Sequence, residues 1–129
     1  MNLLFTGRQL SAMTKLALYA SGSDGEFEPR EIALINAHIR LYVQDDIKTM
    51  ALIDVARTIS YAEAVDVARE MSMNQKRHLC AFIGSVIGAD GNITNSELEF
   101  WSELSYAADL PIMTIEEAIN IFRNNMGVD

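Results

Sequence analysis

The sequence predicts an all-α fold, a single-domain bundle of about seven helices. Its 129 residues suit one domain and leave no room for a second independent core. Half of the residues are hydrophobic, with only 7 Gly and 2 Pro, which is typical of a packed globule rather than of a disordered chain. Apolar residues recur at helical spacing, and no alternating run bounded by turn residues resembles a strand. We therefore expect residues 1–129 to form one helical domain.

Most of the expected helices begin at a capping box, in which a Ser or Thr caps the amide three residues on and a Glu or Gln there reaches back. Five such pairs occur, in chain order Thr6–Gln9, Ser60–Glu63, Ser72–Gln75, Thr94–Glu97 and Thr114–Glu117. Pro29 suits a first helical position, where its missing N–H costs nothing, and Asp45 and Asp46 offer a cap before Ile47. These starts and the apolar spacing predict helices over residues 7–21, 29–43, 46–58, 61–71, 73–87, 95–109 and 115–126.

The helix expected over 73–87 is the most apolar, and we place it at the centre of the bundle. Its section from Leu79 to Ile87 carries no charge, which favours contacts on more than one side. Gly84 and Ser85 are small enough for another helix to approach closely there. Cys80 is expected to be a small core residue rather than a nucleophile, and Trp101 is expected to pack in the core.

An internal repeat relates the two halves of the chain. Residues 22–31 align with residues 88–97 at an offset of 66, and share the pattern G-x-D-G-x-[F/I]-x-x-x-E. Residues 60–67 align with residues 114–121 at an offset of 54, and we assign the difference to one extra helix in the first half. The sequence therefore predicts two helical units with pseudo-twofold symmetry and one shared core, over residues 7–71 and 73–126.

The repeated pattern puts an Asp in each turn and a Glu in the first turn of the helix that follows. If a twofold axis passes near the turns, four carboxylates converge, those of Asp24, Glu31, Asp90 and Glu97. Carboxylates at close range repel one another unless a divalent cation or protonation neutralises them, and oxygen-only ligands favour Ca²⁺, Mg²⁺ or Mn²⁺ over Zn²⁺. A regular EF-hand does not fit, because its positions 1 and 3 lack side-chain oxygens in both copies.

The same acids have a purely structural interpretation, which stays open at this point. Asp-Gly is a common turn pair because Gly accepts positive φ and Asp caps locally. Glu97 is the capping-box partner of Thr94, and Glu31 is an acid that the helix dipole favours in a first turn.

The duplicated segments SDGEFEPRE (residues 23–31) and ADGNITNSE (residues 89–97) resemble the tellurite-resistance TerB family. The resemblance covers nearly the whole chain, and the second copy is the closer match, because Ser23 stands where the family usually has Ala. It implies a bacterial cytoplasmic all-α protein with a role in metal or chemical stress. Carried over by position, the proposed divalent-metal ligands (Ca²⁺ or Mg²⁺) are Asp24, Glu31, Asp90 and Glu97.

Composition and charge disfavour several other functions. A formal net charge of −8 opposes contact with nucleic-acid phosphates. The start MNLLFTGRQ has too short an apolar run for a signal peptide, and the longest uncharged stretch, residues 79–89, is too short to span a bilayer. No nucleophile–base pair, phosphate loop or cofactor fingerprint points to an enzyme. We therefore expect a cytoplasmic, non-enzymatic TerB-like stress protein with an unidentified protein partner. The alternative is a helical protein–protein interaction module in which the acids only cap helices.

Overall fold

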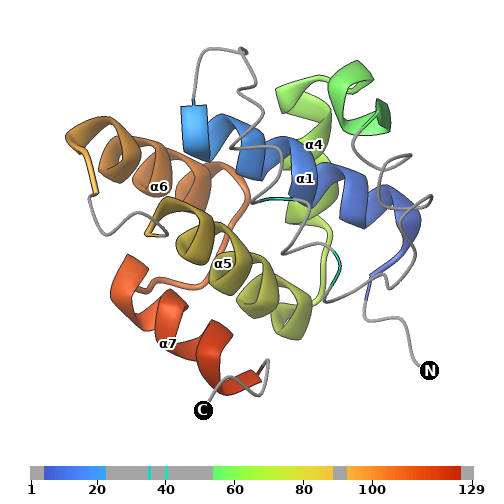
Figure 1. Cartoon of the computed structure of the whole chain (residues 1–129). Coiled ribbons are helices and arrows are strands. Elements are labelled where there is room, and N and C mark those ends of the chain that lie inside the picture. The colour runs from blue at the N-terminus through green and yellow to red at the C-terminus, as the bar shows by residue number, and fades with distance from the viewer. Residues whose placement is uncertain (1–4, 23–34, 36–39, 41–53, 89–92, 126–129) are drawn as a thin grey trace.

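The computed structural model describes residues 5–22, 35, 40, 54–88 and 93–125, and within these ranges the chain forms helices and no strand (Figure 1). The labelled helices are α1 (Gly7–Gly22), α4 (Tyr61–Arg69), α5 (Met73–Ile87), α6 (Asn95–Ala107) and α7 (Ile115–Asn125). Residues 54–58 form a short helical segment before α4. The predicted all-α fold class is therefore confirmed, whereas the symmetry of the two halves stays a prediction. The helix predicted over 29–43 and most of the one over 46–58 lie outside the described residues.

Each labelled helix begins at the residue that the capping pattern predicts. At α1 the Gln9 amide donates to Thr6 Oγ1 (3.1 Å), and the Thr6 amide donates to Gln9 Oε1 (2.9 Å). The same reciprocal pair of bonds starts α5, α6 and α7. At α4 the Glu63 amide donates to Ser60 Oγ (3.1 Å), and the Ser60 hydroxyl lies 3.4 Å from the Glu63 carboxylate. The helix starts are thus fixed by local sequence.

α6 ends two residues before the predicted limit because the chain turns there in a Schellman arrangement. The Leu110 amide donates to Ser105 O (2.9 Å), and the Asp109 amide donates to Tyr106 O (3.3 Å). Asp109 takes the left-handed conformation that this turn requires, with φ 54°. The usual glycine signal for a helix end is absent from this position, which explains why the predicted helix runs too far.

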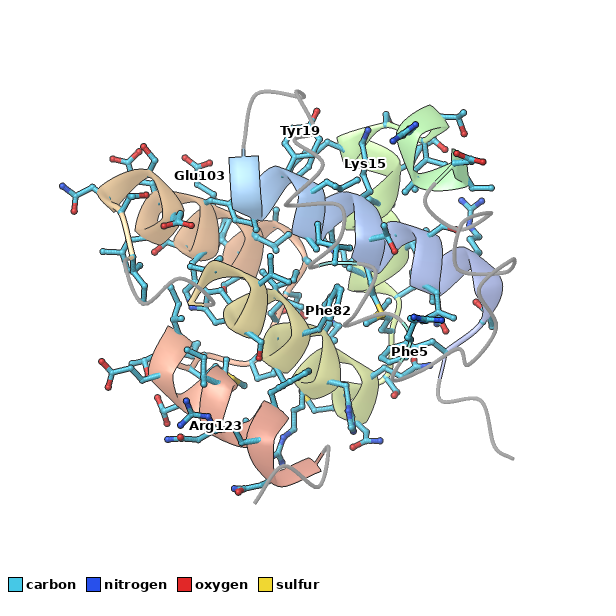
Figure 2. All side chains as sticks on the ribbon, viewed as in Figure 1. Phe5, Lys15, Tyr19, Phe82, Glu103 and Arg123 are labelled. Carbon is cyan, nitrogen blue, oxygen red and sulfur yellow. The ribbon has the colours of Figure 1, made fainter. Side chains whose placement is uncertain are left out.

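α5 forms the centre of the core, as predicted. Every residue from Leu79 to Ile87 is buried, and α5 packs against α1 on one side and α7 on the other. Phe82 is fully buried and lies near the middle of the molecule (Figure 2). Cys80 and Trp101 are also buried, so the core roles expected for them are confirmed.

α5 and α7 make the most extensive contact between any two of the described helices. A Cβ atom added to Gly84 would lie 2.7 Å from Cβ of Ala118, and one added to Gly88 would lie 2.6 Å from Cδ1 of Ile119. Real Cβ atoms do not approach so closely, and Cβ of Ala118 cannot rotate away, so position 84 depends on glycine, whereas at position 88 the end of the Ile119 side chain can move aside. The close approach expected at Gly84 is confirmed, and its partner is α7.

α1 and α4 pack through aromatic rings instead. The ring centroids of Tyr19 and Tyr61 are 4.9 Å apart, and Tyr61 continues to Phe100 of α6 at 6.2 Å. Lys15, one turn before Tyr19, is buried with its ammonium 5.4 Å from the Tyr19 ring centroid (Figure 2). Burial, together with the nearby Glu103 carboxylate, raises the pKa of the Tyr61 phenol. This interface therefore holds a neutral phenol and a cation within apolar surroundings.

None of the described helices combines the length and apolar character needed to cross a bilayer.

Candidate functional site

The two helices that precede the acidic segments are joined at their N-terminal ends. Gln75 Nε2 donates to Gln9 Oε1 (3.2 Å), so the capping boxes of α1 and α5 are directly hydrogen-bonded, 66 residues apart. α1 and α5 pack against each other and extend from this end towards the same side of the bundle (Figure 1). The chain therefore leaves α1 at Gly22 and α5 at Gly88 on one side of the molecule.

Of the four predicted metal ligands, three lie outside the described residues: Asp24, Glu31 and Asp90. Glu97 is described, half-buried in the first turn of α6. Its Oε1 accepts the Thr94 amide (2.8 Å), and its own amide donates to Thr94 Oγ1 (3.2 Å). The capping role that the sequence offered as an alternative is thus confirmed for Glu97. Its second carboxylate oxygen has no partner within the part of the chain that the structure describes.

Two other side chains with reactive groups, Cys80 and His78, are wholly or partly buried. The Cys80 thiol is buried, which raises its pKa to about 12 and keeps it protonated and unreactive. His78 Nδ1 is buried and has no hydrogen-bond partner among the described residues. Burial, and secondly the nearby Arg77, lowers the pKa of the imidazole. Among the described residues, no group of three or more His, Cys, Asp and Glu side chains is arranged to hold a metal ion.

A second candidate site is an open groove of about 760 Å³ along α6 and the connection to α7, which we call the α6 groove. Trp101 and Leu110 are its buried part, and Tyr106 and Ile112 stand at its edge, 91% and 101% exposed. Fully exposed large apolar side chains beside a hollow are typical of surfaces that bind another molecule.

The wall of the α6 groove is held rigidly in place. Trp101 Nε1 donates to Met113 O (3.0 Å), and Lys76 Nζ, from the first turn of α5, donates to Asp109 O (2.9 Å). Lys76 is 5% exposed and also lies 3.9 Å from the Asp109 carboxylate. These bonds tie the connection to α5 and α6, so Ile112 is presented on a fixed support.

The α6 groove was not predicted from the sequence. The sequence signal for an exposed face of α6 is the i, i+4, i+8 spacing of Leu98, Ser102 and Tyr106. In the structure Leu98 is 47% exposed. The spacing of apolar residues indicates a buried face equally well, and only the packing of α6 shows that Leu98 and Tyr106 face outwards.

Comparison with known proteins bears on the fold. The chain is similar to a protein of unknown function from Porphyromonas gingivalis whose crystal structure is known, with a TM-score of 0.78 and 29% sequence identity. The likeness covers 95% of this chain and 90% of that chain. No protein-family profile and no curated protein sequence matches the chain. The helical fold is therefore shared over nearly the whole length.

Proposed function

We propose that the chain is a non-enzymatic, TerB-like stress protein that binds a divalent cation through its paired acidic turns. One observation carries the proposal. α1 and α5 are hydrogen-bonded through Gln9 and Gln75 at one end, and they deliver the chain to the two acidic segments on the same side of the bundle. Two copies of the motif that follow helices ending on the same side of the bundle are suited to share one ion.

The known geometry of Glu97 is compatible with this role. Capping occupies Oε1, so Glu97 can offer one oxygen to a cation rather than two. A site of this kind needs several oxygen ligands, because Ca²⁺ and Mg²⁺ bind six or more. We therefore propose Asp24, Glu31 and Asp90 as the stronger ligands and Glu97 as a single-oxygen ligand.

Thermal unfolding with and without Ca²⁺ or Mg²⁺ tests the proposal. A cation that binds only the folded chain, present at ten times its dissociation constant, should raise the free energy of unfolding by about 1.4 kcal/mol. Asp24→Asn with Asp90→Asn should abolish this gain. The control pair Asp54→Asn with Glu116→Gln changes net charge by the same amount on exposed acids of other segments, and should retain the gain. A wild-type chain that no cation stabilises would contradict the proposal.

A second function, protein–protein interaction, is favoured by the α6 groove. Tyr106 and Ile112 are the most exposed large apolar residues in the described part of the chain, and they flank one hollow. The groove lining carries one base and one acid, Arg69 and Asp109, so a partner with mainly apolar side chains would complement it.

A binding experiment with immobilised protein tests this second function. It compares the proteins retained by the wild-type chain with those retained by a double variant that carries Tyr106→Ser and Ile112→Ser. A specific partner should be lost from the double variant and kept by the control Met73→Ser, since Met73 is exposed on α5 away from the groove residues. Identical retention by all three chains would count against the groove, and would leave the cation proposal unaffected.

A further inference from the structure

A separate hollow of about 390 Å³ opens between the first turn of α1, the segment 54–59 and α4. This volume is within the usual range for small-molecule sites, roughly 300–1,000 Å³. Val55, Ile59 and Val67 give it an aliphatic lining, and Val55 is 47% exposed. At Gly7 an added Cβ would have no atom within 4 Å, so the first turn of α1 leaves this space open.

Two opposite charges line the same hollow without pairing. Arg8 on α1 and Glu63 on α4 both border it, and among the described residues neither forms an ion pair. Among the described residues, the hydrogen-bond partner of the Glu63 carboxylate is the Ser60 hydroxyl, at 3.4 Å. α1 also has no acidic residue in its first turn, so nothing there neutralises the Arg8 guanidinium.

Ser11 adds a hydroxyl to the same lining. It is 3% exposed and borders the hollow on the α1 side. A carboxylate that enters the hollow can accept a hydrogen bond from this hydroxyl, and charge-assisted bonds of this kind are stronger than those between neutral groups.

We propose that this hollow binds a small zwitterion with an aliphatic body, of the size and chemistry of norleucine. Its carboxylate pairs with Arg8 and accepts the Ser11 hydroxyl, and its ammonium pairs with Glu63. Its aliphatic chain packs on Val55, Ile59 and Val67. A simple anion would meet the Glu63 carboxylate, and a simple cation would meet Arg8, so a ligand with both charges fits the lining best. This inference is independent of the cation site and of the α6 groove.

Titration followed by amide NMR tests the proposal with three probes of one carbon skeleton: norleucine, hexanoate, which lacks the amine, and pentylamine, which lacks the carboxylate. Norleucine should shift the amides of Gly7, Ser11 and Val55 saturably. Hexanoate and pentylamine should each bind at least about tenfold more weakly, because each loses one charge-assisted hydrogen bond.

Two variants assign the charges to their residues. Arg8→Gln should weaken norleucine about tenfold and leave pentylamine unchanged, while Glu63→Gln should weaken norleucine about tenfold and not weaken hexanoate. Gln at position 63 still fits the capping pattern of α4, and the control Arg123→Gln, on α7, should leave norleucine binding unchanged. The proposal is overturned if norleucine gives no saturable shift at these amides, or if hexanoate binds the wild-type chain as tightly as norleucine.

Discussion

The helix pairs α1–α4 and α5–α7 start alike and pack differently. Capping boxes fix their starts, but α5 meets α7 through Gly84 and Gly88, whereas α1 meets α4 through Tyr19, Tyr61 and the buried Lys15. The contrast shows that local sequence decides where a helix begins, while a few side-chain volumes decide how closely its neighbour lies.

The sequence offset of 66 makes this difference concrete. Leu18 stands in α1 where Gly84 stands in α5, and Tyr19 stands where Ser85 stands. Ala64 precedes Ala118 by the second offset of 54, and both alanines are fully buried. At these aligned positions α1 therefore carries larger side chains than α5, whose Gly84 lies against Ala118.

The largest expected effect on stability comes from truncating a large buried side chain of α1. Leu18 is 2% exposed, so Leu18→Ala should lower the free energy of unfolding by about 3 kcal/mol, through lost apolar burial and a cavity. Leu98→Ala, on a 47% exposed side chain, should cost under about 1 kcal/mol. Urea unfolding followed by the fluorescence of Trp101 measures both. Equal losses would mean that Leu18 is less tightly packed than its burial indicates.

The next largest effect on stability comes from adding a methyl group where α5 meets α7. Gly84→Ala should lower the free energy of unfolding by about 1–2 kcal/mol, although alanine is the better helix former by about 1 kcal/mol, because its Cβ meets Ala118. Gly7→Ala is the matched control in open space and should stabilise the chain by about 0.5 kcal/mol. Ala118→Gly should restore part of the loss in the Gly84→Ala chain. Wild-type stability in that chain would show that the glycine contact can relax freely.

A smaller difference is expected between the starts of α4 and α7. Thr114 has a reciprocal capping box, so Thr114→Ala should cost about 1 kcal/mol. Ser60 accepts a single capping bond from the Glu63 amide, so Ser60→Ala should cost about 0.5 kcal/mol. Chemical unfolding of both variants at one pH checks this order, and a larger loss at Ser60 would reverse it.

The smallest effect concerns pH. α5 has His78 where the offset places Ala12 in α1, and His78 packs edge-on against Phe5, with ring centroids 6.4 Å apart. Because the folded chain lowers the imidazole pKa below its ordinary 6.5, the unfolded chain binds the proton more readily. The contribution of neutral His78 to stability is therefore complete above pH 6.5 and is lost as pH falls through the folded-state pKa. Urea midpoints between pH 7.5 and 5.5 should fall less steeply for His78→Gln than for the wild type, and parallel slopes would contradict this.

The structural features that depend on neighbours along the chain were predicted correctly from the sequence. The capping pairs gave the starts of all five labelled helices, and the uncharged run around Phe82 gave the central helix. Prediction from the sequence failed where a distant contact decides. Lys76 is a cation that the sequence alone would leave in solvent, yet it is buried because Asp109 O accepts its hydrogen bond from the far end of α6.

The candidate sites divide in the same way. Glu97 was correctly expected to cap α6, because its partner Thr94 is three residues away. The α6 groove and the hollow beside Arg8 arise from segments that meet only in the folded chain, so the spacing of residues along one helix is not enough to predict them. Whether Asp24, Glu31 and Asp90 converge also depends on such long-range placement, and it stays a prediction.

Because Cys80 is buried in α5, the rate at which its thiol reacts with a label measures how often the core around α5 opens. This thiol is the single cysteine of the chain, it is inaccessible in α5, and its pKa of about 12 keeps it protonated at neutral pH. A thiol-specific label can react with it only after α5 has separated from its neighbours, so the labelling rate counts those opening events. Any cation or zwitterion that binds the closed chain will slow the labelling in proportion to its occupancy. Labelling of the unaltered sequence, followed by mass with and without a ligand, can thus report binding before the site is known.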